Sequence, residues 1–148
     1  MTTHLYESTL NWQGRTDSYE NYGRRHEVAV AGSVLTMSAD AAFHGDPGLP
    51  NPEQLVVAAA SSCQLLSFLA VAAHAGVEVL EYEDAASGEM SSEDLPMRLT
   101  NIVLRPRIVV HGASAYRVGR LVRKAHDQCY VANSLGADVI VEPSIETV

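Results

Sequence analysis

The stretch that decides the fold is NPEQLVVAAASSCQLLSFLAVAAHAG, residues 51–76. Asn51 can act as a helix N-cap, Pro52 suits the first helical position, and Gln54 stands where a capping-box partner belongs. Gly76 suits the end of the helix. Because the residues between these signals are apolar on every side, we expect a long helix buried in a soluble core or in the core of a dimer.

A membrane span is the alternative for this helix. Residues 55–73 carry no formal charge and are long enough to cross a bilayer. Three serines and a glutamine interrupt the run, however, and no basic residues flank it as membrane anchors require. We therefore expect a core helix and no membrane partner.

Composition bounds the class of protein. The 148 residues are 47% hydrophobic and 19% charged, which predicts one globular domain over residues 1–148. The net charge of −8 argues against nucleic acid or an anionic membrane surface as the main partner, because phosphate binding needs a basic face. The opening residues MTTHLYESTLNW lack a secretory pattern, so we expect a cytoplasmic protein with reduced thiols.

Strand-like segments precede the long helix. Residues 4–12 alternate weakly and predict a first strand. Residues 25–38 contain two β-rich runs, and Gly32-Ser33 between them suggests a two-residue hairpin turn. The Gly/Pro-rich residues 39–50 predict a loop.

Further segments follow the helix. Residues 77–90 and 97–112 predict strands, with Pro106 suggesting an edge position or a bulge. Residues 114–129 have helical periodicity, and residues 137–148 predict a last strand. The order is βββ-α-ββ-α-β, which favours an α+β fold with antiparallel sheets around the long helix over a doubly wound parallel sheet.

The second helix has two different faces. Ser114 is a candidate N-cap, and the apolar stripe consists of Val118, Leu121, Val122, Ala125 and Cys129. The other side carries the cations Arg117, Arg120, Arg123 and Lys124. An anion site is one interpretation of these cations, and the acidic total favours a solvated helix face.

The only two cysteines, Cys63 and Cys129, both fall on apolar helical surface. They can be buried core residues, since free cysteine is among the most buried residue types. A metal site with His126 is a second option, although two cysteines without a CxxC motif make a poor zinc site. A redox pair is the third, and it requires one thiol to ionise.

The predicted helices do little to ionise either thiol. Cys129 falls at the end of its predicted helix, where the dipole disfavours a thiolate. Cys63 is too deep in its helix for the positive N-terminus to reach. A redox role for Cys63 therefore needs a cation from elsewhere, and arginine is the natural choice because it is always charged.

The residues resemble one known family. NPEQLVVAAASSC, followed much later by KAHDQC and NSL, is similar to the OsmC/Ohr family of small thiol-dependent peroxidases that act on hydroperoxides. The likeness spans nearly the whole chain. It includes a W-x-G motif (Trp12, Gly14) and a Y-x-R-x-H stretch (Tyr22, Arg24, His26) typical of the broader OsmC-like branch.

The resemblance implies roles for four residues. Cys63 would be the peroxidatic cysteine, and Cys129 the resolving one that forms a disulfide with it. An arginine from the N-terminal region would activate Cys63, and Glu53 would orient that arginine. Arg24 matches the motif best, while Arg25 and Arg15 remain open.

The resemblance also implies an α+β fold built as an intertwined homodimer. The expected substrate is an organic hydroperoxide, with hydrogen peroxide open, and the expected reductant is a small or dihydrolipoyl-type thiol. No cofactor and no metal are expected. One departure is Tyr130, where many members have proline directly after the second cysteine.

Helix geometry adds an expectation of its own. Glu53 and Cys63 are separated by about 15 Å of helical rise and point in different directions. Glu53 therefore cannot serve the Cys63 of its own helix. Two antiparallel copies crossing near Ala58, at the small residues AAASS, would bring them together in a homodimer with a shared site. The competing hypothesis is a non-catalytic OsmC-like dimer that binds a small apolar ligand, with both cysteines structural.

Overall fold

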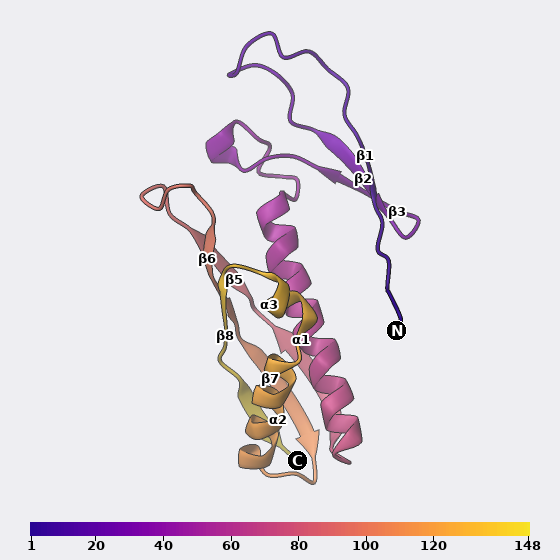
Figure 1. The fold of residues 1–148 in the computed structure, drawn as a ribbon. Helices are drawn as coiled ribbons and strands as arrows, with labels where there is room; N and C mark the ends of the chain where they lie inside the picture. Colours follow the sequence, from indigo (N-terminus) through magenta and orange to yellow (C-terminus); the bar gives the residue numbers. More distant parts are fainter. The chain divides into compact units, whose positions relative to one another are not determined.

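The computed structural model describes residues 1–148, and the chain divides into two compact parts. The N-terminal part is Met1–Leu55 and the C-terminal part is Val56–Val148 (Figure 1). The boundary falls inside the first turns of the long helix. Helices and sheets are mixed in the way that the α+β prediction requires.

The N-terminal part contains one antiparallel sheet in the order β1-β2-β3. Its strands are β1 (Thr9–Asn11), β2 (His26–Val30) and β3 (Ser33–Met37), and a short 3-10 helix η1 (Ala41–Phe43) follows. The predicted first strand, residues 4–12, is thus limited to β1. Only these three residues find partners on β2.

The hairpin turn between β2 and β3 lies one residue earlier than predicted. Val30 pairs with Ser33, so the turn residues are Ala31 and Gly32. Both have positive φ, 49° and 81°, which is the conformation of a type I′ turn. The Gly32-Ser33 prediction was wrong because β3 already begins at Ser33.

Helix α1 (Pro52–His74) begins with the predicted capping box. The Asn51 Oδ1 accepts from the Gln54 N–H at 2.9 Å, and the Gln54 Oε1 accepts from the Asn51 N–H at 3.0 Å. Two backbone donors that the helix leaves free are thereby satisfied. The helix ends before Gly76, whose φ of 71° suits the exit.

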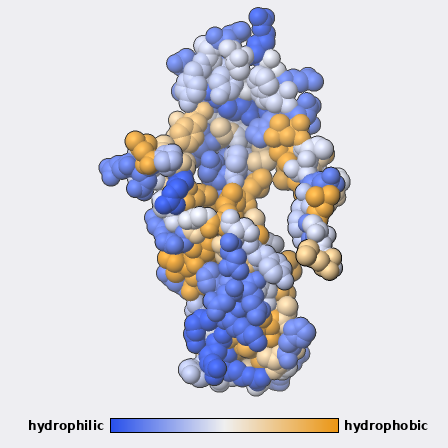
Figure 2. All heavy atoms as spheres, viewed as in Figure 1, coloured by the Kyte–Doolittle hydropathy of each residue, from blue (hydrophilic) through white to orange (hydrophobic).

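Only one face of α1 is buried within the single chain. Phe68 and Ala72 are completely buried. The opposite face is exposed and apolar apart from one serine, and it consists of Ala58, Ala59, Ser62, Leu66, Leu69, Ala70 and Ala73. Figure 2 shows apolar residues reaching the surface in several places. A single chain therefore buries only half of this helix, and its burial in the core of a dimer stays a prediction. α1 is also long and apolar enough to cross a membrane, but its other face belongs to a protein core.

The C-terminal part holds two three-stranded sheets, in the orders β4-β7-β9 and β5-β6-β8. The strands are β4 (Glu78–Asp84), β5 (Ser87–Met90), β6 (Leu99–Leu104), β7 (Pro106–His111), β8 (Asp138–Val141) and β9 (Ser144–Thr147). Each predicted strand run after α1 is thus split into two. The β4–β7 and β5–β6 pairs are antiparallel as predicted, whereas the β6–β8 and β7–β9 pairs are parallel, so these two sheets are mixed.

Asp84 is the last residue of β4 and lies beside the break between β6 and β7. Its carboxylate accepts from the Ser61 hydroxyl of α1 at 2.5 Å and from the backbone N–H of Arg105 at 2.6 Å. The Arg105 side chain donates to the Ser87 hydroxyl at 3.0 Å. Pro106 then opens β7, a central strand, so the edge-or-bulge prediction was wrong. The first position of a strand also tolerates a missing N–H.

The second predicted helix, residues 114–129, is α2 (Ala115–Asp127), and a short helix that was not predicted, α3 (Tyr130–Ser134), follows it. The Ser114 hydroxyl caps α2 by accepting from the Arg117 N–H at 3.2 Å, as predicted. Cys129 lies between the two helices as the N-cap of α3. The prediction that Cys129 is the last residue of the second helix was therefore wrong, because α2 ends at Asp127.

Helices α1 and α2 lie side by side over the strands (Figure 1). Ser67 of α1 donates to the Ala125 carbonyl of α2 at 2.7 Å. One core cluster lies between these helices and β7 and includes Phe68, Val118 and Ile108. A second cluster lies under the first half of α1 and includes Ala60, Ile102 and Leu104. Cys63 lies on α1 and Cys129 lies between α2 and α3, so these packed helices position both thiols.

Candidate functional site

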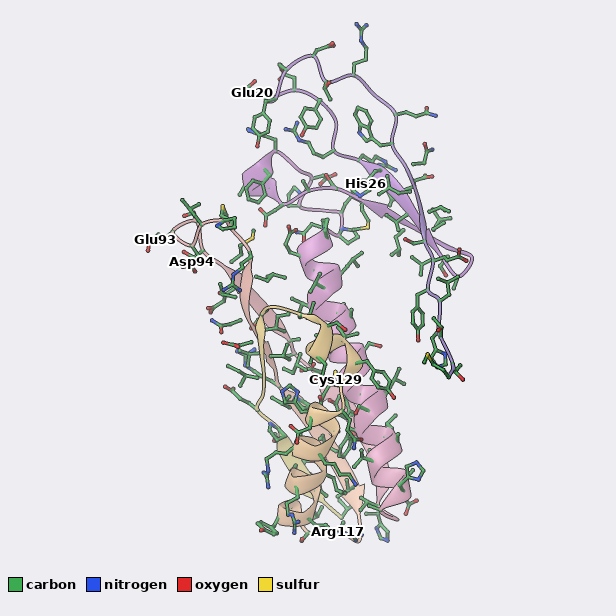
Figure 3. The ribbon with its side chains drawn as sticks, in the orientation of Figure 1. Glu20, His26, Glu93, Asp94, Arg117 and Cys129 are labelled. Atoms are coloured by element: carbon green, nitrogen blue, oxygen red, sulfur yellow. The ribbon has the colours of Figure 1, made fainter.

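The fold brings the two cysteines together although they are far apart in the sequence. Cys63 lies on α1 and is half-buried. Cys129 lies at the α2–α3 junction (Figure 3) and is only 1% exposed. Both are free thiols. They lie close enough for the Cys63 thiol to raise the pKa of Cys129. The pair required by a redox interpretation is therefore present within one chain.

The surroundings of Cys129 raise the pKa of its thiol. Burial is the largest influence on the pKa of Cys129 and raises it, and the neighbouring Cys63 raises it further. Hydrogen bonds from the backbone of Ala132 and Val131 lower this pKa in part. Because the net direction is upward, Cys129 is a neutral thiol in the reduced protein at neutral pH.

Helix α3 supplies a contact that sequence reasoning missed. The backbone N–H of Val131 donates to the Cys63 Sγ at 3.5 Å. The Asn133 side chain ties α3 back to α2 by donating to the Asp127 carbonyl at 3.2 Å. Five residues are too few for hydrophobic periodicity to reveal a helix, so no sequence signal pointed to α3.

Arg24 and Glu53 belong to a different feature, a cavity of about 540 Å³ in the N-terminal part. Both line it, and so do the apolar and aromatic side chains of Leu10, Trp12, Tyr22 and Phe43. Neither Arg24 nor Glu53 takes part in an ion pair of the chain. The orientation of Arg24 by Glu53 stays a prediction.

The Arg24 side chain is held by aromatic rings and carbonyls. Its guanidinium donates to the backbone carbonyls of Tyr19 and Tyr22. The guanidinium carbon lies 3.5 Å from the ring centroid of Tyr22 and 5.2 Å from that of Tyr19. Its buried Nε has no partner, so one donor remains free. The Y-x-R-x-H and W-x-G motifs meet here, because Trp12 donates its ring N–H to the Gly23 carbonyl at 2.8 Å.

The two alternative arginines have other surroundings. Arg15 is exposed and pairs with Asp17 at 3.6 Å. Arg25 is exposed and borders a separate, smaller cavity with Gln13. Of the three candidates, only Arg24 lines the 540 Å³ cavity.

No group of three or more His, Cys, Asp or Glu side chains lies together, so the structure offers no candidate metal site. His126 and Cys129 lie close together just where α2 ends, and the Cys129 N–H donates to the His126 carbonyl at 3.1 Å. No third ligand-type side chain joins them.

Comparison with known proteins settles the family. The family model described as OsmC-like protein matches residues 44–144, which is more than half of the chain. The chain belongs to the OsmC-like family. A curated relative, the peroxiredoxin OsmC of Escherichia coli K12, is 25% identical over 105 residues, covering 71% of this chain and 73% of that protein.

Solved OsmC-like structures have the same fold. An OsmC-like protein of unknown function from Vibrio cholerae superposes with a TM-score of 0.86 at 27% identity, covering 96% of this chain and all of that one. An organic hydroperoxide resistance protein from Elizabethkingia anophelis superposes with a TM-score of 0.74 at 18% identity, covering 99% of each chain. The second likeness concerns the fold alone.

Proposed function

We propose that this protein is a cysteine-based peroxidase that reduces organic hydroperoxides. The observation that carries the proposal is the thiol pair, a half-buried Cys63 beside a buried Cys129. The similarity to the peroxiredoxin OsmC of Escherichia coli supports the same chemistry.

In the first step, the Cys63 thiolate attacks one peroxide oxygen. A sulfur–oxygen bond forms, the O–O bond breaks, and the substrate leaves as an alcohol after taking a proton. Cys63 is oxidised to a sulfenic acid. The Val131 N–H that points at this sulfur favours its negative charge before attack.

In the second step, Cys129 attacks the Cys63 sulfur. A disulfide forms, the sulfur–oxygen bond breaks, and the oxygen leaves as water with the proton of the Cys129 thiol. An external thiol, either a small one or a dihydrolipoyl type, then reduces the disulfide by exchange. A reducing compartment such as the cytoplasm suits this cycle.

Arg24 is the proposed activating cation, and the cavity around it is the proposed substrate site. Its aromatic and aliphatic lining suits the organic group of a hydroperoxide. The guanidinium of Arg24 is a permanent cation on the wall of this cavity, where it would stabilise negative charge on the peroxide or on the sulfur. Glu53, on the same cavity, is the proposed partner that orients Arg24.

A homodimer completes the proposal. The exposed face of α1, with its small and apolar residues, is the surface on which a second copy of α1 would pack. In such a dimer, Arg24 and Glu53 of one chain serve the Cys63 of the other.

The test is a titration with cumene hydroperoxide. The wild type should consume the peroxide and lose both free thiols after one equivalent. Cys63→Ser should consume none, and Cys129→Ser should consume one equivalent and stop at the sulfenic acid. Equal consumption by Cys63→Ser and wild type would overturn the enzyme proposal. A wild type that consumes no peroxide would also overturn it, and would favour ligand binding in the apolar cavity with structural cysteines.

A further inference from the structure

The guanidinium of Arg24 lies closer to the ring of Tyr22 than to the ring of Tyr19. Its carbon is 3.5 Å from the Tyr22 ring centroid. An approach from the ring edge would keep that carbon about 5 Å from the centroid, because carbon atoms in contact are about 3.5 Å apart. The cation therefore lies on the face of the Tyr22 ring, where the π electrons concentrate negative charge.

One turn of the chain presents this ring to Arg24. The backbone N–H groups of Asn21 and Tyr22 donate to the Ser18 carbonyl at 3.3 and 3.2 Å. The turn brings the rings of Tyr19 and Tyr22 together edge to face, with centroids 6.3 Å apart. The carbonyls of the same two tyrosines accept from the guanidinium. The turn thus contacts the cation with both its backbone and its side chains.

Tyr22 is the main side-chain support of Arg24 within the chain. No carboxylate forms an ion pair with Arg24, and its buried Nε has no partner. The ring of Tyr19 is farther away, at 5.2 Å, and this residue is 57% exposed, so water weakens the attraction. The two carbonyl bonds belong to the backbone and do not depend on the side chains of the turn. Replacing the Tyr22 ring therefore removes the closest side-chain contact of the guanidinium.

The place of the guanidinium matters because Arg24 and Tyr22 line the same cavity. A charge stabilises a developing negative charge best when it is fixed in advance, since nothing then has to reorganise during the reaction. A free arginine side chain has many rotamers, and confining it to one of them costs entropy. A ring that already holds the guanidinium lowers this cost before the substrate arrives.

We propose that Tyr22 is a positioning residue, whose ring face fixes the Arg24 guanidinium on the cavity wall for the reaction with peroxide. This inference deepens the proposed peroxidase function and rests on it. Tyr22 makes and breaks no bond in the reaction, and its hydroxyl is not required. The ring acts on the substrate through Arg24 alone.

The first test compares rate constants for the reaction with cumene hydroperoxide. Tyr22→Leu loses the ring face and should react roughly five-fold more slowly than wild type, the effect of one cation–π contact. Tyr22→Phe keeps the ring and should recover a rate within about two-fold of wild type, since the ring and not the hydroxyl holds the cation. The control Tyr116→Leu removes a tyrosine of α2 that is 75% exposed, and should react like wild type.

A second background shows whether Tyr22 acts through Arg24. Arg24→Gln has no cation for the ring to hold, so adding Tyr22→Leu should change the rate by less than about two-fold. A further loss of about five-fold in the double variant would mean that the ring contacts the substrate directly. That result would overturn the positioning role.

Nuclear magnetic resonance gives a readout that does not depend on peroxide. The Nε–H signal of Arg24, identified as the one missing from Arg24→Gln, should be shifted upfield by the nearby ring face. The shift should persist in Tyr22→Phe and be lost in Tyr22→Leu. An unchanged rate and an unchanged signal in Tyr22→Leu would overturn the inference and leave the proposed function standing, whereas a wild type that consumes no peroxide would overturn both.

Should Tyr22→Leu fail to fold, phenylalanine with a fluorinated ring, introduced at position 22 by nonsense suppression, takes its place. Fluorine keeps the ring at nearly the same size and withdraws negative charge from its face. The reaction with peroxide should then be slower than in Tyr22→Phe. An equal or faster rate would count against the inference.

Discussion

The backbone N–H of Val131 donates to the sulfur of Cys63 at a nitrogen-to-sulfur distance of 3.5 Å. This contact joins the middle of α1 to the first turn of α3. Cys63 is too far from the N-terminus of its own helix for that dipole to favour a thiolate. A neighbouring helix thus supplies an oriented N–H donor where α1 cannot.

Removing this donor should slow the reaction with peroxide. Val131→Pro lacks the N–H, while the first turn of a helix tolerates proline. We expect the second-order rate constant with cumene hydroperoxide to fall roughly ten-fold, the usual effect of losing a hydrogen bond to a charged group. Val131→Ala, which keeps the N–H and loses similar packing, is the control and should stay within about two-fold of wild type under the same rule. Equal rates for the two variants would show that the N–H does not matter.

Arg24→Lys should reduce peroxide consumption more than a charge-conserving change usually does. Lysine keeps the charge but cannot donate to the carbonyls of Tyr19 and Tyr22 while lying flat on the Tyr22 ring. We expect at least a ten-fold loss in kcat/KM for cumene hydroperoxide, the size of one charge-assisted contact. The control is Arg15→Lys, because Arg15 is exposed. A loss confined to Arg15→Lys would move the activating role away from Arg24.

Gly45→Ala should disrupt the loop beside the 540 Å³ cavity. A Cβ at residue 45 would lie 1.7 Å from the backbone oxygen of Ala39, and Ala39 lines the cavity. Backbone would have to move, so we expect a lower melting temperature and a raised KM for cumene hydroperoxide. Gly23→Ala is the control, since Gly23 also lines the cavity and a Cβ there meets no atom within 4 Å. Similar values for both variants would contradict the expectation.

Asp84→Ala should destabilise the C-terminal part. Alanine offers no acceptor, so the Ser61 hydroxyl and the Arg105 N–H both lose their partner. We expect a loss of about 1–3 kcal/mol in the free energy of unfolding, measured with urea. Ser61→Ala removes one of the two donors and should cost less. A larger loss for Ser61→Ala would mean that Arg105 contributes little to this junction.

Stability should fall at alkaline pH, because burial makes two side chains harder to ionise in the folded protein. The pKa values of Cys129 and Tyr82 are both raised by burial, so the folded protein holds these protons longer than the unfolded chain does. Their contribution is complete below the unfolded pKa values, about 8.5 for cysteine and 10 for tyrosine, and is lost as pH rises above them. Urea unfolding between neutral pH and pH 11 should show this fall. A smaller fall is expected in Tyr82→Phe.

Local signals in the sequence predicted the helix starts correctly. The reciprocal bonds of Asn51 and Gln54 and the Ser114 cap depend on neighbouring residues, which a single sequence displays. The break between β6 and β7 was not predictable, because it depends on contacts of Asp84 with the distant Ser61 and Arg105.

The candidate site also combines local and long-range features. Its candidate residues were named from the motifs, whereas the nearness of Cys63 to Cys129 depends on the whole fold. The contact from Val131 could not be foreseen, because α3 is too short to show a pattern.

The hydrogen bond between Ser61 and Asp84 has a consequence for oxidation. Two residues before Cys63 the helix is fastened to β4, and four residues after it Ser67 is fastened to the Ala125 carbonyl of α2. The Cys63 sulfur is thus anchored on both sides, whereas Cys129 leads into a five-residue helix. Under the proposed function, bringing the sulfurs to bonding distance would therefore displace residues 128–135 and leave α1 in place. The Cys63 sulfur would then keep one position through the cycle, and amide hydrogen exchange in α3 would report its redox state.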